Sequence, residues 1–159
     1  MNVADYILDL RKTVGHRCLL QVGASVIVED RQGRILLEKR TDNGLWGYPG
    51  GGTELDERVE DAAKRELLEE TGLTANSMAL FGVFSGPETH YVYPNGDEVS
   101  NVDVVFLCRN WTGTIRPQKE EVSEIRFFSA ADMPPVEQLS PPIRPALLKW
   151  REGKRQNAF

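Results

Sequence analysis

Apolar and polar positions alternate along the chain in blocks that predict several strands and a few helices. Over residues 3–13, apolar residues recur at helical spacing with charged residues between them, which predicts a short amphipathic helix. Two apolar runs, 18–29 and 34–40, are rich in β-branched and aliphatic residues and predict strands. The turn-forming residues 30–33 between these runs favour a β-hairpin.

The composition changes abruptly in the middle of the chain. Residues 41–56 contain five glycines and a proline, which predicts a loop whose backbone takes unusual dihedral angles or comes close to another group. A helical segment follows from Asp56 or Glu57 to Thr71, and Gly72 is placed to end it as a C-terminal cap. A glycine-rich loop therefore leads directly into a helix.

The second half of the chain has mainly strand patterns. The strand-like segments cover residues 78–85, 90–94, 98–111 and 124–129. The sequence Pro94–Asp97 predicts a tight turn that joins the second of these strands to the third as a hairpin. A last helix is predicted from Ile143 to about Glu152.

These elements predict one α/β domain with a mixed sheet and few helices. The length of 159 residues suits a single domain with a core large enough to fold without disulfides. We expect a helix and lead-in over residues 1–17, the folded domain over 18–153, and a frayed tail over 154–159.

Charge and cysteine content limit the classes of function. The formal net charge is −5, and an acidic chain is poorly suited to the nucleic-acid backbone, so no stable nucleic-acid partner is expected. Cys18 and Cys108 form no CxxC pair and no zinc-like spacing, which predicts two reduced, buried thiols. With no bilayer-length apolar run and no signal-peptide pattern, we expect a cytoplasmic protein without a membrane partner.

Three carboxylates in the central helix are candidates for metal binding. Glu66, Glu69 and Glu70 lie three and four residues apart, so they share one helix face and repel one another unless protons or cations neutralise them. Mg²⁺ and Mn²⁺ prefer such carboxylate oxygens. An acidic run alone usually faces water, but glycines 50–52 just before this helix would let a backbone approach a phosphate.

At this point the sequence resembles a known family. The fixed positions are Gly51, Glu57, Arg65, Glu66, Leu67, Glu69, Glu70, Gly72 and Leu73. Their spacing resembles the Nudix box of the MutT/Nudix hydrolases at every defined position. The flanking segments 46–51 and 124–129 are similar to the family's approach to the box and to its late strand, so the resemblance extends over about residues 18–150.

The resemblance implies a fold and a metal site. The expected fold is a Nudix-type α/β/α sandwich with a mixed β-sheet and a catalytic loop–helix–loop. The box glutamates Glu66, Glu69 and Glu70 would bind Mg²⁺ or Mn²⁺ together with the backbone carbonyl of Gly50, and one of them would act as or orient the general base. Glu57 and Arg65 would form a structural ion pair that braces the loop against the helix.

A further catalytic carboxylate is expected from a later loop. Counting back from Phe127 in the late strand favours Glu121 as this metal ligand, and Glu120 and Glu124 stay open as alternatives.

The reaction implied is attack of water on phosphorus in a diphosphate linkage, in a nucleoside diphosphate derivative or a nucleoside triphosphate. Arg40, Trp46, Tyr48, Gly51 and Gly52 are candidate substrate-binding residues because they lie just before or within the box. The two aromatic side chains could instead belong to the core, and Arg40 could pair with a neighbouring aspartate.

The sequence leaves the substrate open. Pro87 and Tyr91 lie near the positions that sort ADP-ribose and diadenosine polyphosphate subgroups, but neither occupies the marker position. A non-catalytic Nudix-fold nucleotide-binding module is the alternative function, although such modules usually lose box glutamates. An isoprenyl diphosphate isomerase would need a nucleophilic cysteine, for which neither Cys18 nor Cys108 has the context. A homodimer is a further expectation, from the family alone.

Overall fold

The computed structural model describes residues 5–157. Its helices are α1 (Asp5–Val14), α2 (Val59–Thr71) and α3 (Arg144–Arg155), with short 3₁₀ turns at Pro87–Thr89, Val136–Gln138 and Pro141–Ile143. Its strands are β1 (Leu19–Val28), β2 (Ile35–Arg40), β3 (Trp46–Gly47), β4 (Gly50–Gly52), β5 (Leu73–Phe84), β6 (His90–Val92), β7 (Glu98–Gly113) and β8 (Val122–Phe128).

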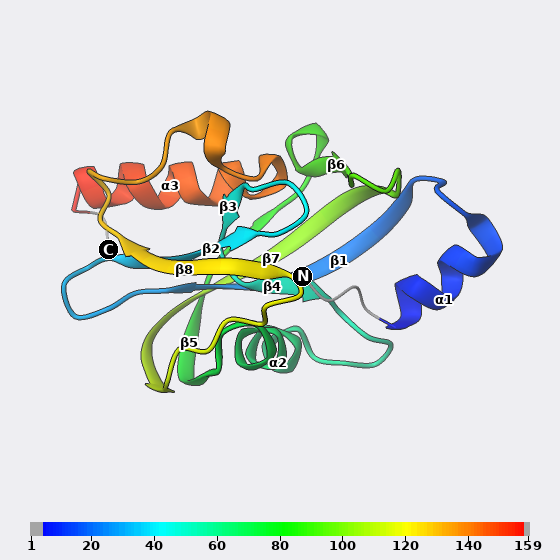
Figure 1. Ribbon diagram of the computed structural model, residues 1–159. Helices are drawn as coiled ribbons and strands as arrows, with labels where there is room; N and C mark the ends of the chain where they lie inside the picture. The colour runs from blue at the N-terminus through cyan, green and yellow to red at the C-terminus, as the bar shows by residue number, and fades with distance from the viewer. Residues whose placement is uncertain (1–4, 158–159) are drawn as a thin grey trace.

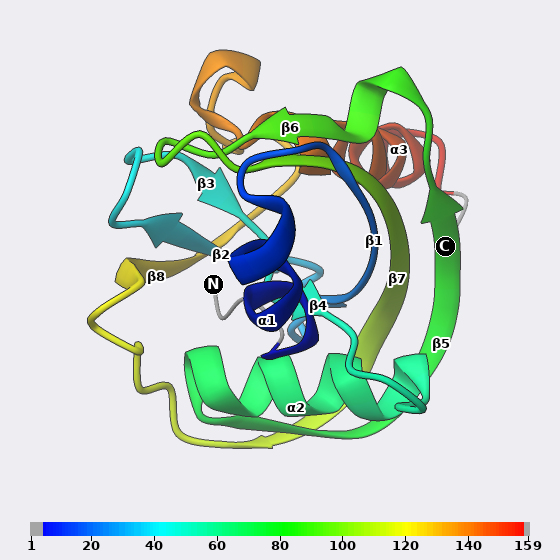
Figure 2. The same ribbon diagram turned by 90° about the vertical axis from the view of Figure 1, so that its right-hand side faces the viewer.

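The strands form two sheets. The larger sheet has the order β4-β1-β7-β5, with β6 paired to β7 at one end, and the smaller has the order β3-β2-β8. The β1–β7 pair is parallel and every other pair is antiparallel, so the larger sheet is mixed. Helices α2 and α3 cover opposite sides of the sheets (Figure 1), and Figure 2 shows the same layering from a second direction.

Each layer has its own core because successive strand residues face opposite sides. On β2, Leu36 packs with the apolar face of α2, whereas Ile35 and Leu37 pack with α3. Both faces of the strands are therefore buried, as expected for an α/β/α sandwich. The predicted fold class is confirmed, and a glycine-containing loop leads into α2 on one side of the mixed sheet.

The predicted hairpin of the first two strands is wrong. β1 and β2 belong to different sheets and share one isolated bridge, between Glu29 and Ile35. The turn itself exists, since Asp30 accepts hydrogen bonds from the backbone N–H groups of Gln32 and Arg34. The strands separate because β1 pairs with β7 and β4, while β2 pairs with β8 and β3.

Other sequence predictions agree more closely with the structure. The hairpin around Pro94–Asp97 is confirmed, since β6 and β7 pair antiparallel with Val92 opposite Glu98. The prediction that both cysteines are buried is wrong for Cys18, which is exposed; Cys108 is buried. Two stretches lie outside the described residues: 1–4 of the predicted N-terminal segment and 158–159 of the predicted tail.

The observed boundaries of some elements differ from the predicted ones by a few residues. α2 begins at Val59 rather than at residue 56 or 57, because Asp56 has a φ of 63° and interrupts the helical path. Gly72 ends the helix with a φ of 80°, and its N–H donates to Leu68 O. Among the described residues, no helix is long and apolar enough to cross a membrane.

Candidate active site

The site begins where the glycine segment passes beside α2. Gly50–Gly52 forms β4, an extended strand paired with β1, and none of these three glycines has a positive φ. A Cβ atom on Gly51 would lie 2.5 Å from Cδ of Glu66. Of the two roles expected for these glycines, the structure favours close approach: the absence of a side chain lets a carboxylate reach the backbone.

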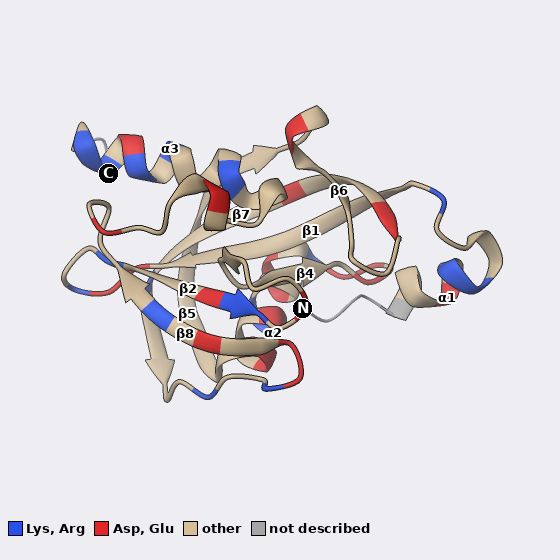
Figure 3. Ribbon diagram, turned by 45° about the horizontal axis from the view of Figure 1, so that its top comes forward, with Lys and Arg blue, Asp and Glu red and all other residues tan. Residues whose placement is uncertain are grey.

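Three glutamate side chains meet beneath this strand. Glu66 and Glu70 are fully buried on α2, and Glu38 on β2 is only 6% exposed. The N–H of Gly50 donates to Glu70 Oε2 at 3.1 Å. Acidic residues of α2, β2 and the segment around β8 gather in this region (Figure 3). Helix and sheet therefore enclose a group of carboxylates.

Burial makes this group electrostatically unusual. It raises the pKa of Glu66 to about 7, with the nearby Glu69 charge adding to the effect. It also raises the pKa of Glu38 and, more strongly, that of Glu70, whose carboxyl group lies within hydrogen-bond reach of Glu38. If Glu38 and Glu70 were both ionised, neither would have a proton to donate to the other. The pair must therefore bind either a proton or a cation.

Several of the carboxylate oxygens have no donor. Among the described residues, Glu38 Oε2, Glu66 Oε2 and Glu70 Oε1 are buried without a hydrogen-bond partner. Leaving a buried charged acceptor unsatisfied costs several kcal/mol, on the order of the penalty for burying an ion. A hard divalent cation bound by these oxygens would remove that penalty, so the donor set fits Mg²⁺ or Mn²⁺.

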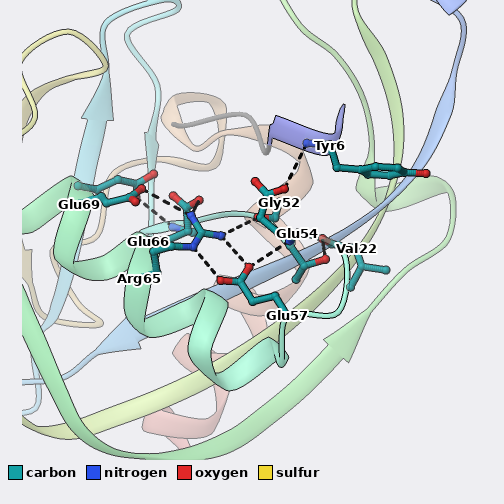
Figure 4. A network of polar contacts seen from close by, with 11 residues as sticks. Tyr6, Val22, Gly52, Glu54, Glu57, Arg65, Glu66 and Glu69 are labelled. Atoms are coloured by element: carbon teal, nitrogen blue, oxygen red, sulfur yellow. Dashed lines mark hydrogen bonds and ion pairs between the residues drawn. The ribbon is translucent and has the colours of Figure 1, made fainter. Parts of the chain in front are cut away.

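Arg65 connects the glycine strand to the helix (Figure 4). Its Nε and Nη2 donate to the two carboxylate oxygens of Glu57, each at 2.9 Å, and Nη2 also donates to Gly52 O at 3.2 Å. Its Nη1 donates to Glu66 Oε1 at 2.9 Å. One planar guanidinium thus fixes the loop, the strand and one oxygen of Glu66.

Glu69 does not share the buried position of the other two box glutamates. Its side chain is 39% exposed, and its Oε2 lies 3.6 Å from Nη1 of Arg65. Burial therefore divides the three box carboxylates, with Glu66 and Glu70 inside and Glu69 at the edge. A role for Glu69 in metal binding stays a prediction, as does that of the Gly50 carbonyl.

The three candidates for the later carboxylate occupy different places. Glu124 on β8 forms an ion pair with Arg126, and Glu120 is exposed on the loop. Glu121 is half-buried, and its charge adds to the main effect of burial in raising the pKa of Glu38. Glu121 is therefore the one of the three whose charge acts on the buried group.

A cleft of about 300 Å³ opens beside Glu121, although Glu38, Glu66 and Glu70 are not among its lining residues. Arg40, Tyr93, Glu120 and Glu121 are among its lining residues. The guanidinium of Arg40 pairs with both oxygens of Asp42 and stacks over the Tyr93 ring, 5.7 Å from its centroid. The cleft thus presents a cation and an aromatic face beside carboxylates.

The structure places Trp46 and Tyr48 mainly in the interior, which is the alternative that the sequence left open. Trp46 is 6% exposed and packs edge-on against Phe128, with ring centroids 5.1 Å apart. Tyr48 is 5% exposed, and its hydroxyl donates to Asp103 Oδ2 at 2.7 Å. Of these two aromatic residues, only Tyr48 lines a smaller pocket that Gly51 also lines.

The sequence reasoning missed Glu38. Its strand alternates, so Glu38 points to the same side of the sheet as Leu36, which packs with α2. A charged residue on the buried face of an apolar strand is the signal that could have identified it.

Comparison with known proteins identifies the family. A NUDIX domain model matches residues 19–150 of the chain. The chain belongs to the Nudix family. An ADP-ribose pyrophosphatase from Methanocaldococcus jannaschii is 32% identical over 150 residues, covering 91% of this chain and 82% of that protein.

Two further relatives extend the comparison. A putative 8-oxo-dGTP diphosphatase from Bacillus subtilis is 48% identical over 66 residues, but the match covers 42% of this chain and 44% of that protein. A MutT NUDIX hydrolase from Burkholderia pseudomallei has a TM-score of 0.68 and 30% identity, covering 82% of this chain and 97% of that one. The predicted family and enzyme class, a Nudix pyrophosphohydrolase, are confirmed.

Replacing Gly51 with Ala tests the close approach in this Nudix site. The added Cβ would overlap the Glu66 carboxylate, so we expect the rate of diphosphate hydrolysis to fall by about a hundredfold or more while the circular dichroism spectrum is kept. Gly23→Ala is the control, because its Cβ would meet its nearest atom at an ordinary 3.5 Å. Equal rates in the two variants would contradict this role of Gly51.

The raised carboxyl pKa values predict how stability depends on pH. For Glu66 the pKa rises from 4.5 to about 7 on folding, so the folded protein binds more protons between these values. The free energy of unfolding of the metal-free protein should therefore fall as pH rises through this range. Urea titrations with chelator at pH 5, 6, 7 and 8 would measure the slope.

Glu38→Gln should make that dependence shallower. A glutamine side chain cannot ionise and its amide can donate to Glu70, so the metal-free variant should be more stable than the parent at pH 8 by about 1–3 kcal/mol. Glu124→Gln, on the exposed ion pair of β8, is the matched control and should leave the slope unchanged. A flat profile in the parent protein would show that these carboxyl groups do not govern its stability.

Proposed function

We propose that this Nudix enzyme is a Mg²⁺- or Mn²⁺-dependent hydrolase that cleaves a diphosphate linkage of a nucleotide-like substrate by attack of water on phosphorus. The observation that carries the proposal is the set of buried glutamate oxygens without donors, located where the Nudix box supplies its carboxylates. The binding-module alternative is not favoured, because the box keeps every glutamate.

The metal would be held by Glu66 and Glu70, with Glu38 from β2, Glu121 from the later loop and the carbonyl of Gly50. Glu69 would join them from the edge of the site. A bound divalent cation neutralises a diphosphate and lowers the pKa of water. An acidic protein could in this way accept an anionic substrate.

The protein's own groups would then divide the remaining work. Arg65 fixes Oε1 of Glu66, so Oε2 is the oxygen that this carboxylate would offer to the cation. One of the box glutamates would act as or orient the general base. Arg40 supplies positive charge in the cleft for a phosphate group, in exchange for part of its pairing with Asp42. Gly51 and Gly52 keep the backbone close to the substrate.

The substrate class rests on two lines of support. Two of the relatives described above carry the names ADP-ribose pyrophosphatase and putative 8-oxo-dGTP diphosphatase, and both names refer to nucleotides with a diphosphate linkage. The aromatic face of Tyr93 in the cleft suits a stacked nucleobase. The cytoplasmic location, the homodimer and the domain limits 1–17, 18–153 and 154–159 stay predictions.

Activity on a substrate panel tests this function. ADP-ribose, nucleotide sugars, dinucleoside polyphosphates and nucleoside triphosphates would be incubated with Mg²⁺ or Mn²⁺, and phosphate release would be followed after phosphatase coupling. We expect at least one nucleotide diphosphate to be cleaved, and Glu70→Gln to slow that reaction by about a thousandfold. Glu60→Gln, exposed in the first turn of the same helix, is the control.

Inactivity of the folded parent enzyme toward the whole panel would favour a binding module instead. Activity of Glu70→Gln equal to that of Glu60→Gln would overturn the metal assignment.

A second comparison tests the later carboxylate. Each of three variants replaces one candidate carboxylate in the same segment: Glu120→Gln, Glu121→Gln or Glu124→Gln. We expect Glu121→Gln alone to raise the Mn²⁺ dissociation constant, measured calorimetrically, by about tenfold or more, because its charge reaches the buried group. A larger effect at either neighbour would move the assignment to that residue.

A further inference from the structure

Three side chains with different metal-binding atoms meet outside the clefts described above. The Sγ of Cys18, a ring nitrogen of His90 and a carboxylate oxygen of Glu98 all lie within 4.8 Å of one another. We call them the Cys18–His90–Glu98 cluster. None of the three residues lines the cleft that contains Arg40, Tyr93 and Glu121. Their side chains are exposed or half-exposed, so an ion could reach them from solvent.

The β1–β7 ladder places Cys18 next to Glu98. Leu19, the first residue of β1, pairs with Val99 in a parallel register. The residues one position before this pair are Cys18, which immediately precedes β1, and Glu98, which begins β7. Residues at paired positions point to the same face of a sheet, so the thiol and the carboxylate project together.

The β6–β7 ladder brings His90 to the same face from the other side. His90 pairs with Ser100 and Val92 pairs with Glu98 in an antiparallel register. Positions two residues apart on a strand share a face, so His90 and Glu98 are diagonal neighbours. The Nε2 of His90 lies 2.8 Å from Oε2 of Glu98. His90 on β6, Glu98 on β7 and Cys18 immediately before β1 thus each contribute one ligand.

The backbone that carries two of these ligands is fixed by Arg11. Its Nη2 donates to Glu98 O at 2.6 Å, and its Nη1 donates to Gly15 O at 2.9 Å and to Arg17 O. One guanidinium therefore links the residue before Cys18 to Glu98 itself. The backbone beside Cys18 and at Glu98 is therefore held in place before any ion arrives, which lowers the entropic cost of binding one.

We propose that the Cys18–His90–Glu98 cluster is a second metal site, for a transition-metal dication such as Zn²⁺. Thiolate, imidazole and carboxylate are the donors that Zn²⁺ accepts, and three protein ligands leave a fourth position for water. Mg²⁺ prefers an all-oxygen set, so this cluster and the glutamate site select different cations. The dication would also offset the negative charge that thiolate and carboxylate place together.

A metal here would act on the edge of the substrate cleft. His90 begins β6, and β6 leads directly to Tyr93, which lines the cleft and stacks with Arg40. Joining β1, β7 and β6 through one ion would hold the β6–β7 hairpin in place. The cluster would therefore be a structural metal site that fixes a segment bordering the substrate cleft, and it would take no part in bond cleavage.

Cobalt binding tests the site, because a thiolate bound to Co²⁺ gives a charge-transfer band in the near ultraviolet that carboxylates do not give. Co²⁺ would be titrated into the full-length protein with Mg²⁺ in excess to occupy the glutamate site. We expect the band to saturate at one equivalent in the parent protein and in Cys108→Ala, whose sulfur is buried. Cys18→Ser should lack the band, and His90→Ala should weaken Co²⁺ binding by about tenfold or more.

Alkylation of the unmodified protein gives an independent measurement. Cys18 is exposed and should react with iodoacetamide, and one equivalent of Zn²⁺ should slow that reaction severalfold as judged by mass spectrometry of the peptides. No charge-transfer band in the parent protein, a band retained in Cys18→Ser, or alkylation of Cys18 at the same rate with and without Zn²⁺ would each overturn the proposal. The contact between His90 and Glu98 would then be an ordinary surface ion pair.

Discussion

The close packing of glutamate carboxylates against a strand of glycines is the constraint on which the rest of this structure depends. Glu66 projects from α2 into a space that a side chain on Gly51 would fill, and Glu70 is buried on the same helix. A backbone N–H from Gly50 and the guanidinium of Arg65 reach these carboxylates and satisfy part of their hydrogen-bonding capacity. The helix, the strand and the loop between them therefore have to be positioned together.

The same packing would link stability to the proposed metal binding. Carboxylates enclosed by a helix and a sheet repel each other, and burial weakens the screening that water would supply. The fold accepts this cost at one place and keeps the surrounding layers apolar, with separate cores on the α2 and α3 sides. In the proposed metal site, a bound cation would relieve this repulsion, and that relief would contribute to the free energy of binding the ion.

The candidate site also depends on segments that are distant in the sequence. Arg40 ends β2, Glu121 precedes β8, and Tyr93 follows β6, yet all three line one cleft. The β6–β7 hairpin connects that cleft to the Cys18–His90–Glu98 cluster. A cation held by that cluster would thus influence the cleft through the position of one short hairpin, without contact with the reacting groups.

The sequence by itself determined the local features of this protein. The box glycine, the Glu57–Arg65 ion pair and the acidic helix all lie within one stretch of 23 residues. The spacing from Gly51 to Leu73 was therefore enough to predict that ion pair, the family, the fold class and the reaction. Local turns, such as the one before β7, were equally readable, because they depend on a few adjacent residues.

Only the tertiary structure decided which distant segments meet. Alternation along a strand tells which residues share a face but not which strand lies beside it, so β1 and β2 looked like a hairpin and instead joined different sheets. The same limit hid Glu38, whose partner Glu70 is on another element. It also hid Cys18, His90 and Glu98, which have no metal-binding spacing in the chain and come together because three strands align in register.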